Sequence, residues 1–278
     1  MALKASAGTL YIVATPIGNL EDITLRALRI LREVDVIAAE DTRHSLKLLN
    51  RYGISKPLIS YWSGREKIRT EVITERLFSG SSVALISDAG TPGISDPGSV
   101  LIRRALESGI AVVPVPGPSA LVAALSVSGL PSGEFTFVGF LPPKAAQRKK
   151  KLSSLALEPR TLVFYEAPHR VIETLKDMQE VFTGRRAEMY RELTKVHEET
   201  VRGTLEEIIE AAEQRTVAGE YVILIEGWRR AVVDIEEALR ELRELMRLGK
   251  GRKEAVRALA ERYGLSKKGL YDRSLLDG

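Results

Sequence analysis

The sequence predicts two α/β domains followed by a small helical unit. Apolar segments of strand length alternate with helical patterns over residues 8–230, which is typical of α/β sheets. Residues 231–278 contain helical patterns only. Because 278 residues exceed the usual size of one hydrophobic core, we expect an N-terminal domain at 8–117, a second domain at 118–230 and a helical appendage at 231–278.

The first domain is expected to contain five strands that alternate with helices, as in a largely parallel sheet. The expected strands are residues 9–14, 35–39, 58–61, 82–86 and 110–115. Asp22 is placed to cap the first helix, and residues 66–78 have the pattern of an amphipathic helix.

Residues 87–98 follow the strand at 82–86 and contain three glycines and two prolines. No helix or strand continues through such a segment, so the chain leaves the strand through an ordered loop. Open α/β sheets bind ligands at this carboxyl end of their strands. The loop is therefore a candidate ligand site, although a well-formed turn without a ligand explains the same residues.

A second loop of this kind, residues 114–120, leads from the last strand of the first domain into a helix at 120–127. Ser119 is placed to cap that helix, so its hydroxyl and the free N–H groups of the first turn would face one cleft. A helix cap without a ligand is the simpler interpretation of this segment. The two domains would meet near Pro116, and clefts between domains are preferred sites for small ligands.

The second domain is expected to have strands at 135–140, 161–165, 187–193 and 221–226, separated by helices. One of these helices carries a basic run, made of Lys144, Arg148, Lys149, Lys150 and Lys151. Such a run is typical of a solvated face, and it also fits contact with phosphate.

The last residues, 231–278, are expected to form three helices. The first ends at Gly249, the second stops at 263–264, and Ser266 caps the third, which gives a helix-turn-helix outline. From Arg247 onward nine basic side chains accompany four acidic ones, an excess larger than the net charge of +4 of the whole chain. The candidate phosphate contacts are Lys250, Arg252, Lys253, Arg257, Lys267 and Lys268. A solvated appendage that only supports a dimer is the alternative.

Other features exclude several classes of site. The chain has no cysteine, so it has neither disulfides nor a thiolate nucleophile. The Gly-rich dinucleotide and P-loop motifs and the Gly-x-Ser-x-Gly elbow are absent. The three histidines lack the spacing of metal ligands, so we expect no metal site. With no signal peptide or membrane span apparent, we expect a soluble cytoplasmic protein.

Five segments, residues 10–24, 40–43, 87–98, 116–120 and 165–170, together resemble the tetrapyrrole methylase family. Within it they are similar to the branch that methylates the 2′-oxygen of a cytidine in small-subunit ribosomal RNA. The resemblance implies two α/β domains with S-adenosylmethionine in the cleft between them, a homodimer, and ribosomal RNA, within the small subunit, as the substrate. The family fold also permits a small tetrapyrrole substrate, and a non-enzymatic, cofactor-sensing RNA-binding module is a third possibility.

The resemblance also implies which residues contact the cofactor. They are Pro16, Ile17 and Gly18 in the first loop, Gly90, Thr91, Pro92, Gly93 and Ile94 in the second, Ser119 and Ala120, and Tyr165. Thr91 stands where relatives carry an aspartate, so a carboxylate there would have to come from Asp88 or Asp96.

Transfer of a methyl group to a ribose hydroxyl requires in-line alignment and an acceptor for the hydroxyl proton. Glu166 is the first candidate for this base because it follows a strand end in the second domain, and His169 and Asp88 come next. Arg43 and Lys195 are candidate anchors for the substrate RNA. For each of these residues, a helix cap or an ion pair between domains is the structural alternative.

Overall fold

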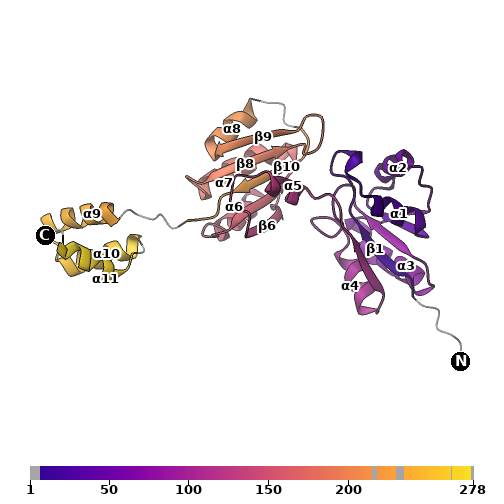
Figure 1. Ribbon diagram of the computed structural model, residues 1–278, viewed down its shortest axis with the longest axis horizontal. Helices are drawn as coiled ribbons and strands as arrows, with labels where there is room; N and C mark the ends of the chain where they lie inside the picture. The colour runs from indigo at the N-terminus through magenta and orange to yellow at the C-terminus, as the bar shows by residue number, and fades with distance from the viewer. Residues whose placement is uncertain (1–6, 215–217, 230–234, 264, 277–278) are drawn as a thin grey trace. The chain divides into compact units, whose positions relative to one another are not determined.

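The computed structural model describes residues 7–214, 218–229, 235–263 and 265–276 (Figure 1). The chain forms two compact units that divide between Glu226 and Gly227. The first unit contains two five-stranded sheets, and the second contains three helices. The predicted boundary between 230 and 231 lies outside the described residues.

The first sheet has the strand order β3-β2-β4-β1-β5, and every pairing in it is parallel. Its strands are β1 (Thr9–Val13), β2 (Val36–Ala39), β3 (Leu58–Ser60), β4 (Val83–Ile86) and β5 (Ala111–Val115). The helices between them are α1 (Leu25–Glu33), α2 (Thr42–Arg51), α3 (Glu66–Phe78) and α4 (Ser99–Glu107), with short 3-10 turns η1 (Leu20–Asp22) and η2 (Ser63–Arg65). The predicted parallel sheet is confirmed.

Helices cover both faces of this sheet. Leu31 of α1 and Leu49 of α2 pack on one face, while Ile73 of α3 and Leu101 of α4 pack on the other. All residues of β2 and β4 are therefore buried, which explains their continuous apolar sequences.

The second sheet is mixed, with the order β6-β7-β10-β8-β9. Its strands are β6 (Phe135–Phe140), β7 (Thr161–Glu166), β8 (Arg186–Arg191), β9 (Glu199–Thr204) and β10 (Tyr221–Ile225). Only β6 and β7 pair in parallel, whereas β10 runs antiparallel to both β7 and β8. Helices α6 (Ala145–Ser154), α7 (Val171–Val181) and α8 (Leu205–Glu213) pack on one face, and α5 (Ala120–Ser126) packs on the other. A 3-10 turn, η3 (Pro168–Arg170), precedes α7.

In its described residues the second unit contains α9 (Ile235–Arg247), α10 (Arg252–Tyr263) and α11 (Lys267–Leu276), as the sequence predicts. Its core includes Leu242, Leu259 and Leu270. Ser266 caps α11, since its Oγ accepts a hydrogen bond from the Gly269 N–H at 3.2 Å. In the described part of the chain, no helix is long and apolar enough to span a membrane.

Three local predictions are wrong. Asp22 lies in η1, and Thr24 caps α1 instead because its Oγ1 accepts from the Ala27 N–H at 3.1 Å. The strand β9 lies where only helix was expected, because its alternating and half-exposed residues carry little apolar signal. Ser119 occupies the N-cap position of α5 but makes no capping hydrogen bond through its side chain.

Candidate active site

A cavity of about 420 Å³ lies in the first unit at the ends of strands from both sheets. The residues that line it from the first sheet and its loops are Ile17, Glu40, Asp88, Ala89, Gly90, Thr91, Ile94, Ser95 and Asp96. Those that follow Pro116 are Ser119, Ala120, Leu121, Phe140, Tyr165, Glu166, Glu192, Leu193, Lys195, Glu220, Tyr221 and Val222. Both loops chosen from the sequence therefore reach one cavity, which we call the central pocket.

The loop after β4 is tied to the loop after β1. The Thr15 N–H donates to the Gly90 carbonyl at 2.8 Å, and the Gly90 N–H donates back to the Thr15 carbonyl at 3.0 Å. Thr15 Oγ1 also donates to the Ser87 carbonyl at 3.0 Å. Gly90 has a φ of +74°, a conformation that side chains disfavour, so a glycine is required at this turn. The pairing holds the Gly90 backbone against the central pocket.

The predicted cofactor residues do not all reach the pocket. Ile17, Gly90, Thr91, Ile94, Ser119, Ala120 and Tyr165 line it, whereas Pro16, Gly18, Pro92 and Gly93 are not among its lining residues. Gly18 instead allows a close approach between the two halves of the unit. A Cβ atom there would lie 2.5 Å from Lys195 Cγ and 2.8 Å from the Leu193 carbonyl oxygen.

One wall of the central pocket is acidic. Asp88 Oδ1 accepts from the Asp41 N–H at 3.0 Å, which fixes this carboxylate beside Glu40. Burial raises the pKa of Asp96 to about 7, and the negative charges of Glu40 and Asp88 contribute to the increase. Burial also raises the pKa of Glu40, with a further contribution from Asp88. Carboxylates held this close to one another favour a positively charged ligand.

Another wall is aromatic. The Tyr165 ring contacts Phe137 and Phe140 edge to face, at centroid distances of 5.0 and 5.7 Å. Its hydroxyl accepts a hydrogen bond from the Leu121 N–H at 3.0 Å, and burial raises the pKa of Tyr165. This arrangement offers a fixed, flat surface on which a ligand ring can pack.

Lys195 is the basic residue of the pocket lining. Its Nζ lies 2.7 Å from Glu192 Oε1 and 3.4 Å from Glu220 Oε2. The segment that carries it is strained, because Glu192 and Thr194 have φ values of +52° and +66°. Such strain persists only where the surrounding structure imposes it, and here it brings Lys195 to the mouth of the pocket.

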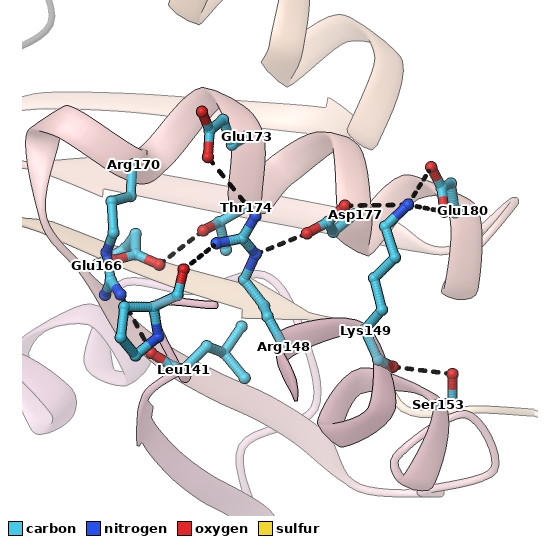
Figure 2. Close-up of polar contacts among 11 residues, drawn as sticks. Leu141, Arg148, Lys149, Ser153, Glu166, Arg170, Glu173, Thr174, Asp177 and Glu180 are labelled. Carbon is cyan, nitrogen blue, oxygen red and sulfur yellow. Dashed lines mark hydrogen bonds and ion pairs between the residues drawn. The ribbon is translucent and has the colours of Figure 1, made fainter. Parts of the chain in front are cut away.

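Glu166, the first candidate for the base, is fully engaged in the interior (Figure 2). Its Oε1 accepts from Arg170 Nη2 at 2.5 Å and from the Ala167 N–H at 2.8 Å, and its Oε2 accepts from Thr174 Oγ1 at 2.7 Å. The side chain is 0% exposed. Three donors already hold this carboxylate in place, so the geometry argues for a structural role and against the expected catalytic one.

The other candidates differ in position. Asp88 lines the central pocket, and His169 is exposed in η3 and outside the lining. Arg43 lies at the start of α2 with its side chain 91% exposed, 3.6 Å from Asp41 Oδ1 through its Nε. Of the two predicted RNA anchors in this unit, only Lys195 reaches the pocket.

The basic run in α6 is partly structural. Arg148 is buried, and its Nε donates to Asp177 Oδ2 at 2.6 Å (Figure 2). Lys149 bridges Asp177 and Glu180 of α7, at 3.4 and 2.7 Å. Arg148 Nη1 also donates to the Pro143 carbonyl at 3.4 Å. Arg148 and Lys149 therefore hold α6 against α7. We no longer expect these two residues to contact phosphate.

Sequence reasoning missed Glu220 and Phe140 as lining residues. Glu220 precedes β10, and the start of a strand is the wrong end for a site in a parallel sheet. Because β10 runs antiparallel to β7, Tyr221 pairs with Glu166 and brings Glu220 to the pocket. A prediction that β10 runs antiparallel to β7 would have placed Glu220 at the pocket.

The fold and the pocket define an α/β enzyme with a cavity of small-ligand size between a parallel and a mixed sheet. The chain belongs to the tetrapyrrole (corrin/porphyrin) methylase family, whose model matches residues 9–209, and it is a methyltransferase. The family resemblance found in the sequence is thereby confirmed.

Curated relatives match most of the chain. A ribosomal RNA small subunit methyltransferase I from Pseudomonas aeruginosa is 50% identical over 277 residues, which covers 97% of this chain and 98% of the relative. One from Xylella fastidiosa strain Temecula1 is 54% identical over 226 residues, or 80% of this chain and 83% of the relative.

Solved structures share the fold at lower identity. A cobalt precorrin-4 methyltransferase of cobalamin biosynthesis aligns with a TM-score of 0.60 and 18% identity, covering 78% of this chain and 94% of its own. A uroporphyrin-III C-methyltransferase from Thermus thermophilus, solved with S-adenosylhomocysteine, aligns with a TM-score of 0.58 and 22% identity, covering 78% and 97%. The expected fold of two α/β domains is thus confirmed.

Proposed function

We propose that this protein uses S-adenosylmethionine to methylate the 2′-oxygen of a cytidine ribose in ribosomal RNA of the small subunit. The observation that carries the proposal is the central pocket, which combines an acidic wall with an aromatic one beside a glycine turn. The 50% identity to a small-subunit rRNA methyltransferase over nearly the whole chain supports the substrate. A homodimer, as the family resemblance implies, and the cytoplasmic location expected from the sequence are part of the same proposal.

The pocket fits this cofactor in size and chemistry. A volume of about 420 Å³ lies within the range of about 300 to 1,000 Å³ usual for small-ligand sites. Glu40, Asp88 and Asp96 complement a ligand that carries a sulfonium and an ammonium group. Tyr165 and Phe140 offer a surface for its adenine ring. When bound, S-adenosylmethionine supplies an activated methyl group.

We assign the binding contacts to the residues that line the pocket. Gly90, Thr91 and Ile94 present backbone from the loop after β4, and Ser119 and Ala120 present the start of α5. The Ser119 hydroxyl does not cap the helix, and it lies beside Tyr165 in the pocket lining. Four predicted cofactor residues do not line the pocket, and we assign them a supporting role. Pro16 and Gly18 lie in the loop after β1, and Pro92 and Gly93 lie in the loop after β4.

The proton of the ribose hydroxyl requires an acceptor at the pocket. Asp96 is half-buried in the lining with a pKa of about 7, which burial and the neighbouring Glu40 charge produce. A general base must be ionised before it can accept a proton. A cation in the pocket lowers this pKa and leaves Asp96 ionised. We therefore propose that Asp96 accepts the proton of the ribose hydroxyl. Asp88 is the second carboxylate of the pocket.

The second unit adds a basic surface suited to RNA phosphates. Lys253, Arg257, Lys267 and Lys268 line a shallow pocket of about 320 Å³ on α10 and α11. All four side chains are exposed. Lys250 and Arg252 lie at the start of α10. This surface would supply the sequence-independent part of the RNA affinity.

The test is methyl transfer from tritiated S-adenosylmethionine by the purified protein. Assembled small ribosomal subunits, extracted small-subunit RNA and uroporphyrinogen are offered in parallel reactions. The proposal predicts label in the RNA or the subunits only. Label in the tetrapyrrole would support the alternative of a small tetrapyrrole substrate. The structural neighbours at 18–22% identity do not by themselves support that alternative. RNA binding without label in any substrate would support the non-enzymatic module.

A further inference from the structure

Helix α2 carries basic side chains at regular intervals along one side. Arg43, Lys47 and Arg51 are each four residues apart, and all three are exposed. Ser45, Leu48 and Leu49 form the buried side. At 1.5 Å of rise per residue, successive basic residues are about 6 Å apart along the helix axis. We call these three residues the α2 ridge.

The ridge is free to bind a ligand. Within the described ranges, Lys47 and Arg51 form no ion pair, and Arg43 has only its contact with Asp41. Exposed basic side chains without partners keep their full charge for an anion and need not break an existing bond to bind it. A row of three cations about 6 Å apart suits consecutive phosphates of an extended nucleic-acid strand.

The two ends of α2 lie at two different cavities. At its start, the Asp41 N–H donates to Asp88, which lines the central pocket. At its end, Arg51 and Tyr52 line a second and more open groove of about 820 Å³. The Tyr52 hydroxyl donates to the Leu20 carbonyl at 2.6 Å, which fixes one wall of the groove.

The groove and the central pocket share one lining residue. Lys195 lines both cavities, and Val196 and His197 follow it in the groove. Val196 is 96% exposed, so it offers an apolar surface to a base. Glu21 is the acidic residue of the groove lining, and Arg51 and Lys195 are its basic residues. The lining therefore has more basic than acidic side chains.

We propose that the α2 ridge and this groove bind the single-stranded RNA that flanks the target nucleotide. The target ribose enters the central pocket past Lys195, a neighbouring base lies on Val196, and the phosphates of the flanking nucleotides contact Arg51, Lys47 and Arg43. A duplex does not fit this path, because a base can enter a pocket of about 420 Å³ only after it leaves the stack. The inference rests on the proposed function, since it assumes that RNA is the substrate.

The test compares full-length charge-reversal variants. In the ridge variant, Lys47→Glu is combined with Arg51→Glu. In the control variant, Arg76→Glu on α3 is combined with Arg103→Glu on α4, two exposed residues of helices that pack on the opposite face of the same sheet. Both variants change the net charge equally. S-adenosylmethionine affinity by calorimetry and thermal unfolding establish that both are folded.

The ridge variant is expected to raise KM for small subunits at least 10-fold while kcat changes less than 2-fold. Loss of two phosphate contacts on a single strand should reduce the slope of log affinity against log salt by about 1.4. The milder pair Lys47→Gln and Arg51→Gln should give an intermediate KM, and the control variant should match the wild type. A ridge variant with the KM and salt slope of the control would overturn the proposal.

A second assay separates this proposal from the proposed function. Binding of a 12-nucleotide single-stranded RNA is measured by fluorescence anisotropy for wild type, ridge variant and control. If the wild type methylates no RNA but the ridge variant alone loses RNA affinity, the ridge proposal is supported and the proposed function fails. If the wild type methylates small subunits and all three proteins bind the oligonucleotide equally, the ridge proposal fails alone.

Discussion

Arg170 Nη2 donates a hydrogen bond to Glu166 Oε1 at 2.5 Å, and Glu166 lies at the lining of the central pocket with its side chain buried. Arg170 Nη1 also donates to the Leu141 carbonyl at 3.3 Å, next to Phe140 in the pocket wall. This pair therefore links the end of β7 to the loop after β6. Its role is to keep Phe140 and Tyr165 in place.

We predict that Glu166→Ala lowers the free energy of unfolding by about 3 to 5 kcal/mol, because the largely buried Arg170 guanidinium loses its carboxylate partner and keeps the Leu141 carbonyl as its acceptor. Glu166→Gln, which keeps one acceptor, should cost less. In the fraction that is folded, kcat should stay within a few-fold of the wild type. Chemical denaturation and active-site titration measure the two effects separately. A folded, stable Glu166→Gln protein whose kcat falls 1,000-fold would restore Glu166 as the base.

Gly90 and Gly93 form a matched pair in the loop after β4. Their φ values are +74° and +82°, so alanine at either position is strained by about 1 to 2 kcal/mol. Only Gly90 lines the central pocket, whereas a Cβ on Gly93 would lie 3.4 Å from Ile102 Cδ1 of α4. Both variants should lose similar stability, but only Gly90→Ala should weaken S-adenosylmethionine binding, by at least 10-fold in calorimetry. Equal affinities of the two variants would remove the backbone of this turn from the site.

The pKa of Asp96 makes stability and binding depend on pH. Since its pKa of about 7 exceeds the ordinary value of 3.8, the folded state favours the protonated form, and ionisation destabilises the fold as the pH rises from about 4 to 7. Asp96→Asn removes this effect. The Tm of Asp96→Asn minus the Tm of the wild type should therefore increase as the pH is raised from 5 to 8. A difference in Tm that is constant over this range would contradict the assignment.

The same residue should couple cofactor binding to proton release. A cationic ligand favours ionised Asp96, so the wild type should bind S-adenosylmethionine more tightly at pH 7.5 than at pH 5.5. Asp96→Asn should show a weaker pH dependence and a lower kcat. Calorimetry in two buffers of different ionisation enthalpy measures the protons released. Equal proton release by the two proteins would exclude Asp96 as the group that titrates.

The parallel sheet could be predicted to within a residue or two at each strand end. Its central strands β2 and β4 are buried on both faces, so each appears as a short apolar run bounded by loops. The mixed sheet was harder to predict. The residues of β9, Glu199–Thr204, are half exposed and lack an apolar run, and the reversed direction of β10 depends on contacts distant in sequence.

The candidate site was predictable where a backbone conformation requires a residue type, as at Gly90. It was not predictable where the role depends on partners in space. Glu166 follows a strand end, as a catalytic carboxylate often does, but Arg170 and Thr174 lie four and eight residues further on and engage it completely. Asp96 has a raised pKa because it is buried and because Glu40, more than fifty residues earlier in the chain, adds a negative charge beside it.

The basic surface of the second unit can be tested within the full chain. Replacing Lys253, Arg257, Lys267 and Lys268 by glutamine should leave S-adenosylmethionine affinity unchanged and weaken binding to small subunits. Loss of four phosphate contacts should reduce the salt slope by about 3. Truncation after Arg230 should have at least as large an effect. An unchanged salt slope in both proteins would show that this unit makes no phosphate contacts.

The most direct measurement is nucleoside analysis of small-subunit RNA after reaction with the pure protein and S-adenosylmethionine. The RNA is digested to nucleosides, and methylated products are identified by mass spectrometry against an Asp96→Asn reaction run in parallel. We predict 2′-O-methylcytidine as the product of the wild type and much less of it from the variant. A methyl group on a base, on another nucleoside, or on no RNA at all would contradict the proposed function.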